Sequence, residues 1–595
     1  AWYTGKKERD DVLKKKLLTG LGALLGAFAS AFALFRFTGM ALPYGVLLFL
    51  PALLGCWLVW DRLLRIDWRG KDEILPGLYA GLLALSFVVG RKIHLWSEPF
   101  FEAVRAADLI YWLIFTVFFF CAVRWGLEAV SRTVRPWERR PRRRMVFWLV
   151  FAGILLCWLP TFLVYYPGKL ASDSLSSIRQ AMGIMPLKNH HPVVFTLLVK
   201  LCMQPGLWLG NANLAVATFT AVQMVGFALM LSAGVYWLYR RGAPLWGWLG
   251  AAFFFGLNPV IAGYAVTMWK DTLFGGFCLL TILVLADAVE SRGAIFLQAG
   301  GLCRLAFGVL GMAFFRNNGK YILLLVLPVL VLVFRAYWKR LLPLCAALLI
   351  GIFAMQGPGY RALGVEAGSF TEAVGVPLQQ VAYTLREKGE VSAEQRAFLD
   401  RLMPTEKMAS LYTPGTVDSI KFNEAYNWDE LDANKGEFLK VWLSMLPKNF
   451  KLYTKAWLME TLGYFHIGTT GSVIFNDISD PKQAAELGIT TDDRVAALTG
   501  LDLKPVIYRG TMALMKLPVL DTLFSLGAMF WFLIFCCLSW LRGKEWRRIL
   551  AVLPLIGCWG TLMIAAPTYC EFRYLFALHL ALPLLAAGLL KGAKR

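Results

Sequence analysis

Residues 135–168 read RPWERRPRRR, then MVFWLVFAGILLCWLPTFLV, then YYPG: a basic cluster, an apolar run and a polar turn. The apolar run covers residues 145–164. In a helix, about 20 such residues cross the roughly 30 Å hydrocarbon core of a bilayer. Short basic segments beside such helices stay in the cytoplasm. This stretch therefore predicts a helix that leaves the cytoplasm near residue 145 and emerges outside near residue 165.

The same pattern recurs along the 595-residue chain, which is 58% hydrophobic. We expect an all-α polytopic membrane protein with about fourteen transmembrane helices. The predicted spans are residues 17–35, 40–60, 74–90, 109–130, 145–164, 213–238, 245–265, 272–289, 294–315, 321–334 and 341–355, and three more after residue 516. The first run also resembles a signal peptide, because lysines precede it and Ala29, Ser30 and Ala31 follow. Its cleavage is an alternative that leaves the later topology unchanged.

The formal net charge of +22 lies in short clusters between the apolar runs. That distribution predicts cytoplasmic loops facing anionic membrane lipids, and it excludes nucleic acid as the partner. Both termini are then cytoplasmic. The clusters are residues 14–16, 135–144, 240–241, 335–340, 542–548 and 594–595.

One apolar segment, residues 192–209, leaves two topologies open. If it spans the membrane, Arg240, Arg241 and every later basic loop fall outside. If it lies along the outer interface, all later basic loops fall inside. The second choice satisfies the charge pattern throughout, and we adopt it.

This topology predicts four parts. Residues 1–144 form an N-terminal four-span addition, and residues 145–356 form a transmembrane core with an external loop at 165–211. Residues 357–516 form a small, mainly helical external domain, and residues 517–595 form a C-terminal three-span segment. In the external domain, residues 392–402 and 432–446 have the spacing of amphipathic helices, and residues 370–389 also look helical. Residues 449–465 are aromatic-rich and suit the membrane surface.

The first external loop carries Asp173 and the Asn189-His190-His191-Pro192 stretch. Asp173 is a candidate general base. The alternative is a helix cap, with the helix beginning at Ser174. His190 and His191 point in different directions and do not form a bidentate metal site. One of them could contact a phosphate or orient the carboxylate; the alternative is an interfacial turn before Pro192.

Three further charged motifs fall on the same face. Lys270 and Asp271 begin a helix, where Lys270 suits a phosphate and Asp271 could be the N-cap. Arg316 and Asn317 lie between two apolar helices, and Glu571, Arg573 and Tyr574 lie at another helix mouth. Arginine suits bidentate phosphate contacts, and its alternative is a snorkelling interfacial residue.

Together, the motifs YYPG, Asp173, NHHP, WKD, FRNNG and EFRY resemble those of a poorly characterised bacterial branch of the GT-C glycosyltransferase superfamily. The resemblance covers about residues 145–590. It implies transfer of a sugar from a polyprenyl-phosphate donor to a cell-envelope glycan or lipid acceptor, with inversion, on the outer face of the bacterial plasma membrane. It implies Asp173 as general base and Lys270, Arg316 and Arg573 as ligands of the donor phosphate. The supporting residues are His190, His191, Asn317, Asp271, Glu571 and Tyr574.

Many members of that superfamily carry two acidic residues close together in the first loop, whereas this loop offers Asp173 alone. We therefore expect no cofactor and no metal, with a divalent metal as the alternative. A polymerase or ligase of lipid-linked glycans is a second candidate function, and a lipid or solute transporter is a third. Transporters place ionisable residues near mid-membrane and often contain repeats. The charges here lie at helix ends, which favours the enzyme.

Overall fold

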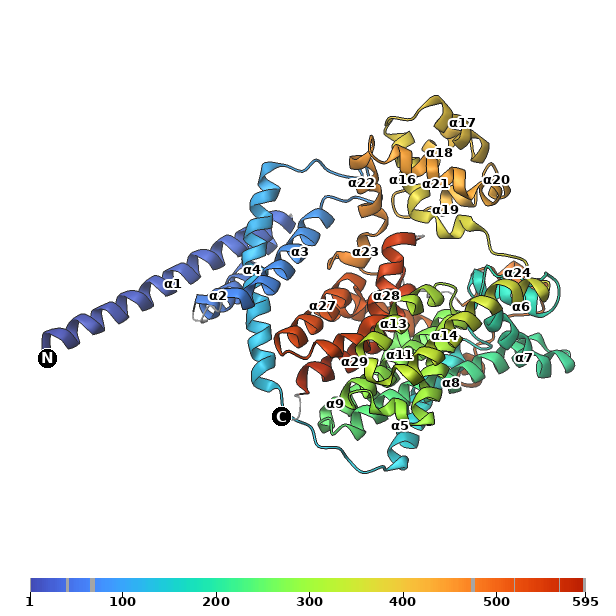
Figure 1. Cartoon of the computed structure of the whole chain (residues 1–595), viewed down its shortest axis with the longest axis horizontal. Coiled ribbons are helices and arrows are strands. Elements are labelled where there is room, and N and C mark those ends of the chain that lie inside the picture. Colours follow the sequence, from blue (N-terminus) through green and yellow to red (C-terminus); the bar gives the residue numbers. More distant parts are fainter. Residues whose placement is uncertain are drawn as a thin grey trace.

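The computed structural model describes residues 2–38, 42–64, 70–471, 473, 477–517, 519–566 and 568–591. The predicted start of the second span at Met40 and the terminal Lys594 and Arg595 lie outside these ranges. Within them the regular structure is helical, with isolated β-bridges and no strand (Figure 1). An all-helical membrane-type fold is confirmed for this part of the chain.

The bundle and the helices beside it have long apolar sequences. They are α1 (Trp2–Thr38), α2 (Leu42–Leu64), α3 (Ile74–Gly90), α4 (Ala106–Thr133), α5 (Arg144–Val164), α7 (Val193–Trp208), α8 (Ala212–Arg240), α9 (Leu245–Leu257), α10 (Pro259–Ala265), α11 (Lys270–Glu290), α12 (Ala299–Phe315), α13 (Gly319–Val333), α14 (Trp338–Ala354), α27 (Leu526–Arg542), α28 (Ile549–Ala565) and α29 (Phe576–Leu590).

The remaining helices are between 3 and 13 residues long. They are α6 (Ser172–Ala181), α15 (Tyr360–Ala362), α16 (Gly375–Arg386), α17 (Ala393–Leu402), α18 (Thr405–Leu411), α19 (Asp418–Lys421), α20 (Trp428–Ala433), α21 (Lys435–Met445), α22 (Phe450–Glu460), α23 (Leu462–Phe465), α24 (Pro481–Glu486), α25 (Arg494–Thr499) and α26 (Lys504–Lys516).

Length and composition make nine helices in the described ranges able to cross a membrane. The bent pair α9–α10 makes a tenth if it counts as one span. Three other predicted spans, α12, α13 and α27, are apolar but contain 15 to 17 residues. Nine or ten candidate spans therefore stand, and the count of fourteen stays a prediction.

The predicted span at residues 245–265 is two helices, bent by 57°. The break falls at Asn258, whose side-chain oxygen accepts from the backbone N–H of Val260 at 3.0 Å and caps α10. The next residue, Pro259, has no N–H to continue the hydrogen bonding of α9. A residue before proline also avoids the helical conformation. Average hydropathy does not detect this break, because the whole stretch is apolar.

The segment at residues 192–209 forms α7, which is only 16 residues long. The Phe195 and Phe219 rings lie 5.7 Å apart, and a Cβ at Gly206 would meet the backbone of Ala215. Both ends of α7 thus contact the first two turns of α8. Helix α7 stays at one end of the bundle, where it lies beside α6 (Figure 1). This placement is compatible with an interfacial helix.

Helix α11 joins two clusters of charge at opposite ends of the bundle. Its 21 residues rise about 30 Å. We call the first cluster the Lys270 end, where Lys270 and Arg573 both pair with Asp173. We call the second the Glu290 end, where Arg241, Asp287, Glu290 and Lys591 meet.

Arg304 belongs to the Glu290 end, although the sequence places it near the middle of the predicted span at residues 294–315. That stretch divides into a short 3-10 turn (Ala294–Leu297) and α12, so Arg304 lies in the second turn of α12. Its guanidinium reaches Asp287 at 3.3 Å. A basic residue one turn from a helix end can extend to the polar boundary.

The predicted external helices are confirmed as helices, and they share one hydrophobic core that runs from Val374 to Leu462. Residues 392–402 form α17, whose N-terminus is capped by the Ser392 hydroxyl. Residues 432–446 contain α21, and residues 370–389 contain α16. The aromatic-rich segment forms α22, and Trp457 on it donates to the Met563 carbonyl at 2.8 Å. This contact joins the domain to the bundle.

Two further segments pack on the Val374–Leu462 core and on the bundle, respectively. The loop between α3 and α4 contributes Ile93 and Leu95 to the core between Val374 and Leu462, and Glu98 pairs with Arg386. The segment around α24 instead packs against α6, α7 and α8 through Ala484, Leu487 and Ile489. The α3–α4 loop therefore joins the helices between Val374 and Leu462, and the α24 segment packs on the bundle itself.

Candidate functional site

The YYPG turn aligns Asp173 with Lys270. Gly168 has a φ of +144°, and a Cβ there would lie 2.4 Å from Thr220 Oγ1, so the position requires glycine. The Lys169 N–H donates to the Val266 carbonyl at 2.9 Å, and the Met268 N–H donates back to the Lys169 carbonyl at 3.0 Å. This short pairing brings α6 beside the start of α11.

Asp173 does not cap α6. The helix begins at Ser172, and its N-cap is Ala171. The Ala171 N–H donates to the Ser174 hydroxyl at 2.9 Å, and that hydroxyl donates to the Met268 carbonyl at 2.7 Å. Ser174 thus fixes the helix start and leaves the Asp173 carboxylate for other contacts.

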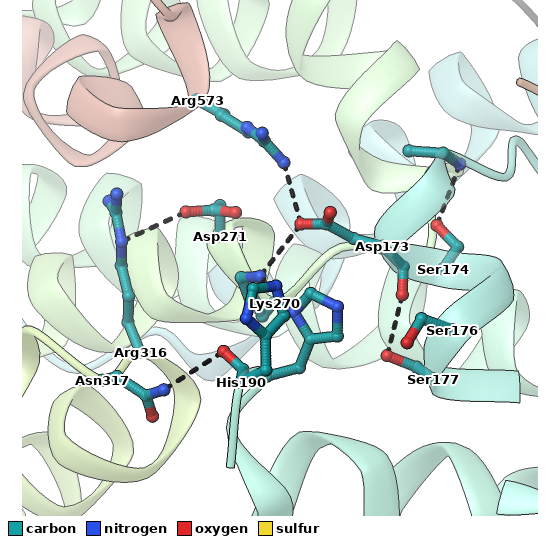
Figure 2. A network of polar contacts seen from close by, with 12 residues as sticks. Asp173, Ser174, Ser176, Ser177, His190, Lys270, Asp271, Arg316, Asn317 and Arg573 are labelled. Atoms are coloured by element: carbon teal, nitrogen blue, oxygen red, sulfur yellow. Dashed lines mark hydrogen bonds and ion pairs between the residues drawn. The ribbon is translucent and has the colours of Figure 1, made fainter. Parts of the chain in front are cut away.

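The Asp173 carboxylate pairs with two cations from distant parts of the chain (Figure 2). Lys270 Nζ lies 2.9 Å from Oδ2, and Arg573 Nη1 lies 3.0 Å from the same oxygen. Among the described residues, the structure records no hydrogen bond or ion pair for Oδ1. Because 26% of the side chain is exposed, Oδ1 can receive a further group.

These cations determine the protonation of Asp173. Burial alone would raise the pKa of the carboxyl, but the positive charges of Lys270 and Arg573 outweigh it and hold the pKa well below its ordinary value. Asp173 is therefore ionised at neutral pH. While both cations are paired with it, the carboxylate is a weak base.

Lys270 has a second acceptor in His191. Its Nζ lies 2.9 Å from His191 Nδ1. Burial and the Lys270 charge lower the pKa of His191 well below its ordinary value, so the ring is neutral. A neutral ring that accepts at Nδ1 carries its proton on Nε2. His191 therefore orients the ammonium group without competing with it for Asp173.

Arg573 is held by aromatic rings. Its guanidinium carbon lies 4.9 Å from the centre of the Trp269 ring and 5.2 Å from that of Tyr574. Its Nε lies 3.6 Å from the Glu571 carboxylate. Cation–π contacts of this kind orient a guanidinium while keeping its N–H groups available.

Arg316 and Asp271 form a separate pair beside this cluster (Figure 2). Arg316 Nε lies 3.4 Å from an Asp271 oxygen, and Arg316 Nη1 donates to the Tyr574 carbonyl at 3.0 Å. Asp271 is only 1% exposed, and the N-cap of α11 is Trp269, so Asp271 is not the cap. Arg316 is thus paired with the carboxylate of Asp271, the residue that follows Lys270, and not with Asp173. Its predicted contact with a phosphate stays a prediction.

The two remaining predicted residues shape the histidine loop. Asn317 donates to the carbonyls of Asn189 at 2.9 Å and His190 at 3.3 Å. The exposed His190 ring lies edge-on against His191, with 4.5 Å between ring centres. Asn317 therefore ties the loop that carries both histidines to the start of α13.

All ten predicted site residues lie in this connected network, although their catalytic and binding roles remain predictions. In the part of the chain that the structure describes, no three His, Cys, Asp or Glu side chains gather as metal ligands. The metal-independent reading stays a prediction.

The sequence analysis gave Trp269 no role within the WKD motif and did not single out Gln223. The Gln223 amide donates to the Ala265 carbonyl at 3.0 Å and the Thr267 carbonyl at 2.6 Å, which fixes the turn before Lys270. A lone amide inside an apolar span is the signal that could have identified Gln223.

Residues 181–595 match the model of a family described as a family of unknown function, DUF6020. This match covers more than half of the chain. The chain belongs to the DUF6020 family. Within this DUF6020 protein, Lys270, Arg316 and Arg573 lie inside the matched region, and Asp173 lies shortly before it. No curated protein and no solved structure matches the chain.

Proposed function

We propose that this DUF6020 protein is an integral membrane glycosyltransferase that uses a polyprenyl-phosphate sugar as donor. The observation that carries the proposal is the arrangement at Asp173. One oxygen of a surface-accessible carboxylate holds two cations from separate helices, and the other oxygen remains for a substrate. A base next to an anion-binding pair is what this reaction requires.

The proposed reaction uses Asp173 as the base and Lys270 with Arg573 as the anion-binding pair. Asp173 Oδ1 takes the proton of an acceptor hydroxyl, and the hydroxyl oxygen attacks the anomeric carbon of the donor sugar. The bond from that carbon to the phosphate oxygen breaks, and its electron pair stays on the phosphate. Lys270 and Arg573 stabilise the charge that develops there. Attack on the face opposite the phosphate inverts the anomeric configuration.

Because Lys270 and Arg573 contact Asp173, donor binding changes the basicity of the Asp173 carboxylate. Lys270 and Arg573 pair with Asp173 in the structure and keep its pKa low. A phosphate competes for both cations, because charge-assisted hydrogen bonds to phosphate are strong. As the cations move toward the phosphate, the pKa of Asp173 rises and the carboxylate becomes a better base. The acceptor is then activated mainly when a donor is present.

Arg316 acts indirectly in this scheme. It pairs with Asp271 and binds the Tyr574 carbonyl, so it positions the ring that lies beside Arg573. His191 similarly positions Lys270. Both are positioning residues here, and the direct phosphate contacts come from Lys270 and Arg573.

The membrane orientation is part of the proposal. Basic residues from several loops lie at the Glu290 end, including Arg139, Arg241, Arg304, Arg548 and Lys591. The positive-inside pattern places that end in the cytoplasm and the Lys270 end outside, with about fourteen crossings. The acceptor is then a glycan or lipid on the outer face of a bacterial plasma membrane.

Turnover in proteoliposomes tests the proposal. The full-length protein is given a panel of short-chain polyprenyl-phosphate hexoses and pentoses, with a membrane glycolipid extract as acceptor. We expect acceptor-dependent release of polyprenyl phosphate. Asp173→Asn should lower it by about 10³-fold, within the range for losing a general base. Asp287→Asn, at the Glu290 end, is the control and should retain turnover per folded molecule.

Two results would overturn the proposal. Near-normal turnover by Asp173→Asn removes the general-base role. Movement of the lipid across the bilayer without release of polyprenyl phosphate would instead establish a transporter.

A further inference from the structure

A cavity of about 680 Å³ opens at the Glu290 end, about 30 Å along α11 from Asp173. It lies between the start of α5 and helices α8, α11 and α12. Its rim is basic: Arg139, Arg142, Arg144, Arg240, Arg241 and Arg304 line it. No step of the proposed transfer uses it.

The positive charge of this rim is only partly neutralised. Asp287 is the one carboxylate among the lining residues, and it pairs with Arg241 and Arg304. Glu290 lies close by and pairs with Arg139 and Arg241. For Arg142 and Arg144, the described residues provide no recorded ion pair, and both are exposed. These two guanidinium groups can therefore bind an anion.

The walls below the rim are apolar. Leu280, Val284 and Phe307 line the cavity. From Asp287 back to Leu280 the α11 surface extends about 10 Å toward the middle of the bundle. A soluble anion would leave these walls exposed to water, whereas an amphiphile covers them with hydrocarbon while its headgroup stays at the rim.

We propose that this cavity binds the phosphate headgroup and upper acyl chains of an anionic phospholipid. Arginine suits the phosphate because its planar group donates two parallel hydrogen bonds. Basic pockets between helices at the cytoplasmic side are suited to acidic lipid headgroups. The proposal does not depend on sugar transfer, because it concerns the opposite end of α11, but it rests on the cytoplasmic placement of that end proposed above.

Native mass spectrometry of the delipidated full-length protein in a non-ionic detergent tests this site. The probes are phosphatidylglycerol and phosphatidylcholine with identical acyl chains. We expect one phosphatidylglycerol to bind at least about tenfold more tightly than phosphatidylcholine. In Arg142→Gln/Arg144→Gln this preference should fall to within about twofold. Both residues are exposed, so the variant should fold normally.

The matched control is Arg335→Gln/Arg547→Gln. It removes two positive charges at the same end but outside the cavity: Tyr337 beside Arg335 packs on Gly293, and Arg548 beside Arg547 donates to Lys591. This variant should keep the preference. An equal loss in the control would reduce the effect to general surface charge and overturn the site. Displacement of the lipid by excess glycerol phosphate would show a site for soluble anions and overturn the lipid assignment.

Discussion

The two ends of α11 hold similar residues in different arrangements. At the Glu290 end, Asp287 accepts from Trp237 and Arg241 on one oxygen and meets Arg304 on the other. Glu290 likewise pairs through both oxygens. At the Lys270 end, both cations of Asp173 share one oxygen. We call a carboxylate saturated when both of its oxygens are paired, and such carboxylates hold helices together. A carboxylate with one unpaired oxygen can react with a substrate.

The largest effect on stability should come from removing the ion pairs at the Glu290 end. Arg241→Met leaves Asp287 and Glu290 without their shared buried partner, and we expect a loss of about 3 kcal/mol or more in unfolding free energy. Thermal unfolding in detergent measures the loss. Turnover per folded molecule should stay normal. If turnover falls while the unfolding temperature is unchanged, the Glu290 end takes part in the reaction.

The next prediction tests whether Arg316 positions other residues or binds the donor phosphate directly, as Lys270 and Arg573 are proposed to do. Arg316→Gln leaves the buried Asp271 carboxylate without its paired charge, and we expect a loss of up to about 3 kcal/mol in unfolding free energy. Arg316→Gln/Asp271→Asn should recover most of that stability and should bind polyprenyl phosphate within about tenfold of wild type. A double variant that is stable but binds no polyprenyl phosphate would make Arg316 a direct phosphate ligand.

The pH dependence of stability tests the lowered pKa of Asp173. A carboxyl whose pKa is lower in the folded than in the unfolded protein adds stability above its unfolded pKa, about 3.9. That stability is lost as pH falls through the lower folded pKa. The difference in unfolding temperature between wild type and Asp173→Asn should therefore be constant from about pH 7 to 5 and shrink below about pH 4. Shrinkage already between pH 7 and 5 would contradict the pairing with Lys270 and Arg573.

The smallest effect concerns the histidine loop. Asn317→Ala removes two hydrogen bonds to loop carbonyls, each worth about 1 kcal/mol. We expect kcat/KM to fall by about tenfold or less, with a smaller drop in unfolding temperature than Arg241→Met causes. Asn427→Ala, which removes the N-cap of α20, is the control and should leave kcat/KM unchanged. An equal fall in both variants would remove the loop from the site.

The sequence was sufficient to group the site residues at one end of the bundle, and the membrane side of that end stays a prediction. Asp173, Lys270 and Arg573 are separated by 97 and 303 positions in the chain, yet each follows an apolar run that ends on the same predicted face. Counting spans from basic loops assigns that face. It does not determine distances, because helices that share a face need not be neighbours. The shared oxygen of Asp173 and the Lys270–His191 contact therefore required the structure.

Other features could not be predicted from the sequence, and each has its own structural reason. The bend at Asn258 lies within a uniformly apolar stretch, and hydropathy averages over it. The pairing of Arg316 with Asp271 depends on how α11 and α13 pack, which periodicity alone does not specify. Likewise, nothing in the composition of residues 91–105 indicates that Ile93 and Leu95 enter the core shared by the helices between Val374 and Leu462.

The central claim is that Lys270 and Arg573 exchange Asp173 for the donor phosphate. Its most direct test is the affinity of full-length protein for a short-chain polyprenyl phosphate, which needs no knowledge of the sugar. Lys270→Gln/Arg573→Gln should bind at least about 100-fold more weakly than wild type. Asp173→Asn should bind as tightly or more tightly, because it removes the competing carboxylate. If the double variant binds like wild type, or Asp173→Asn loses binding while remaining folded, the exchange does not occur.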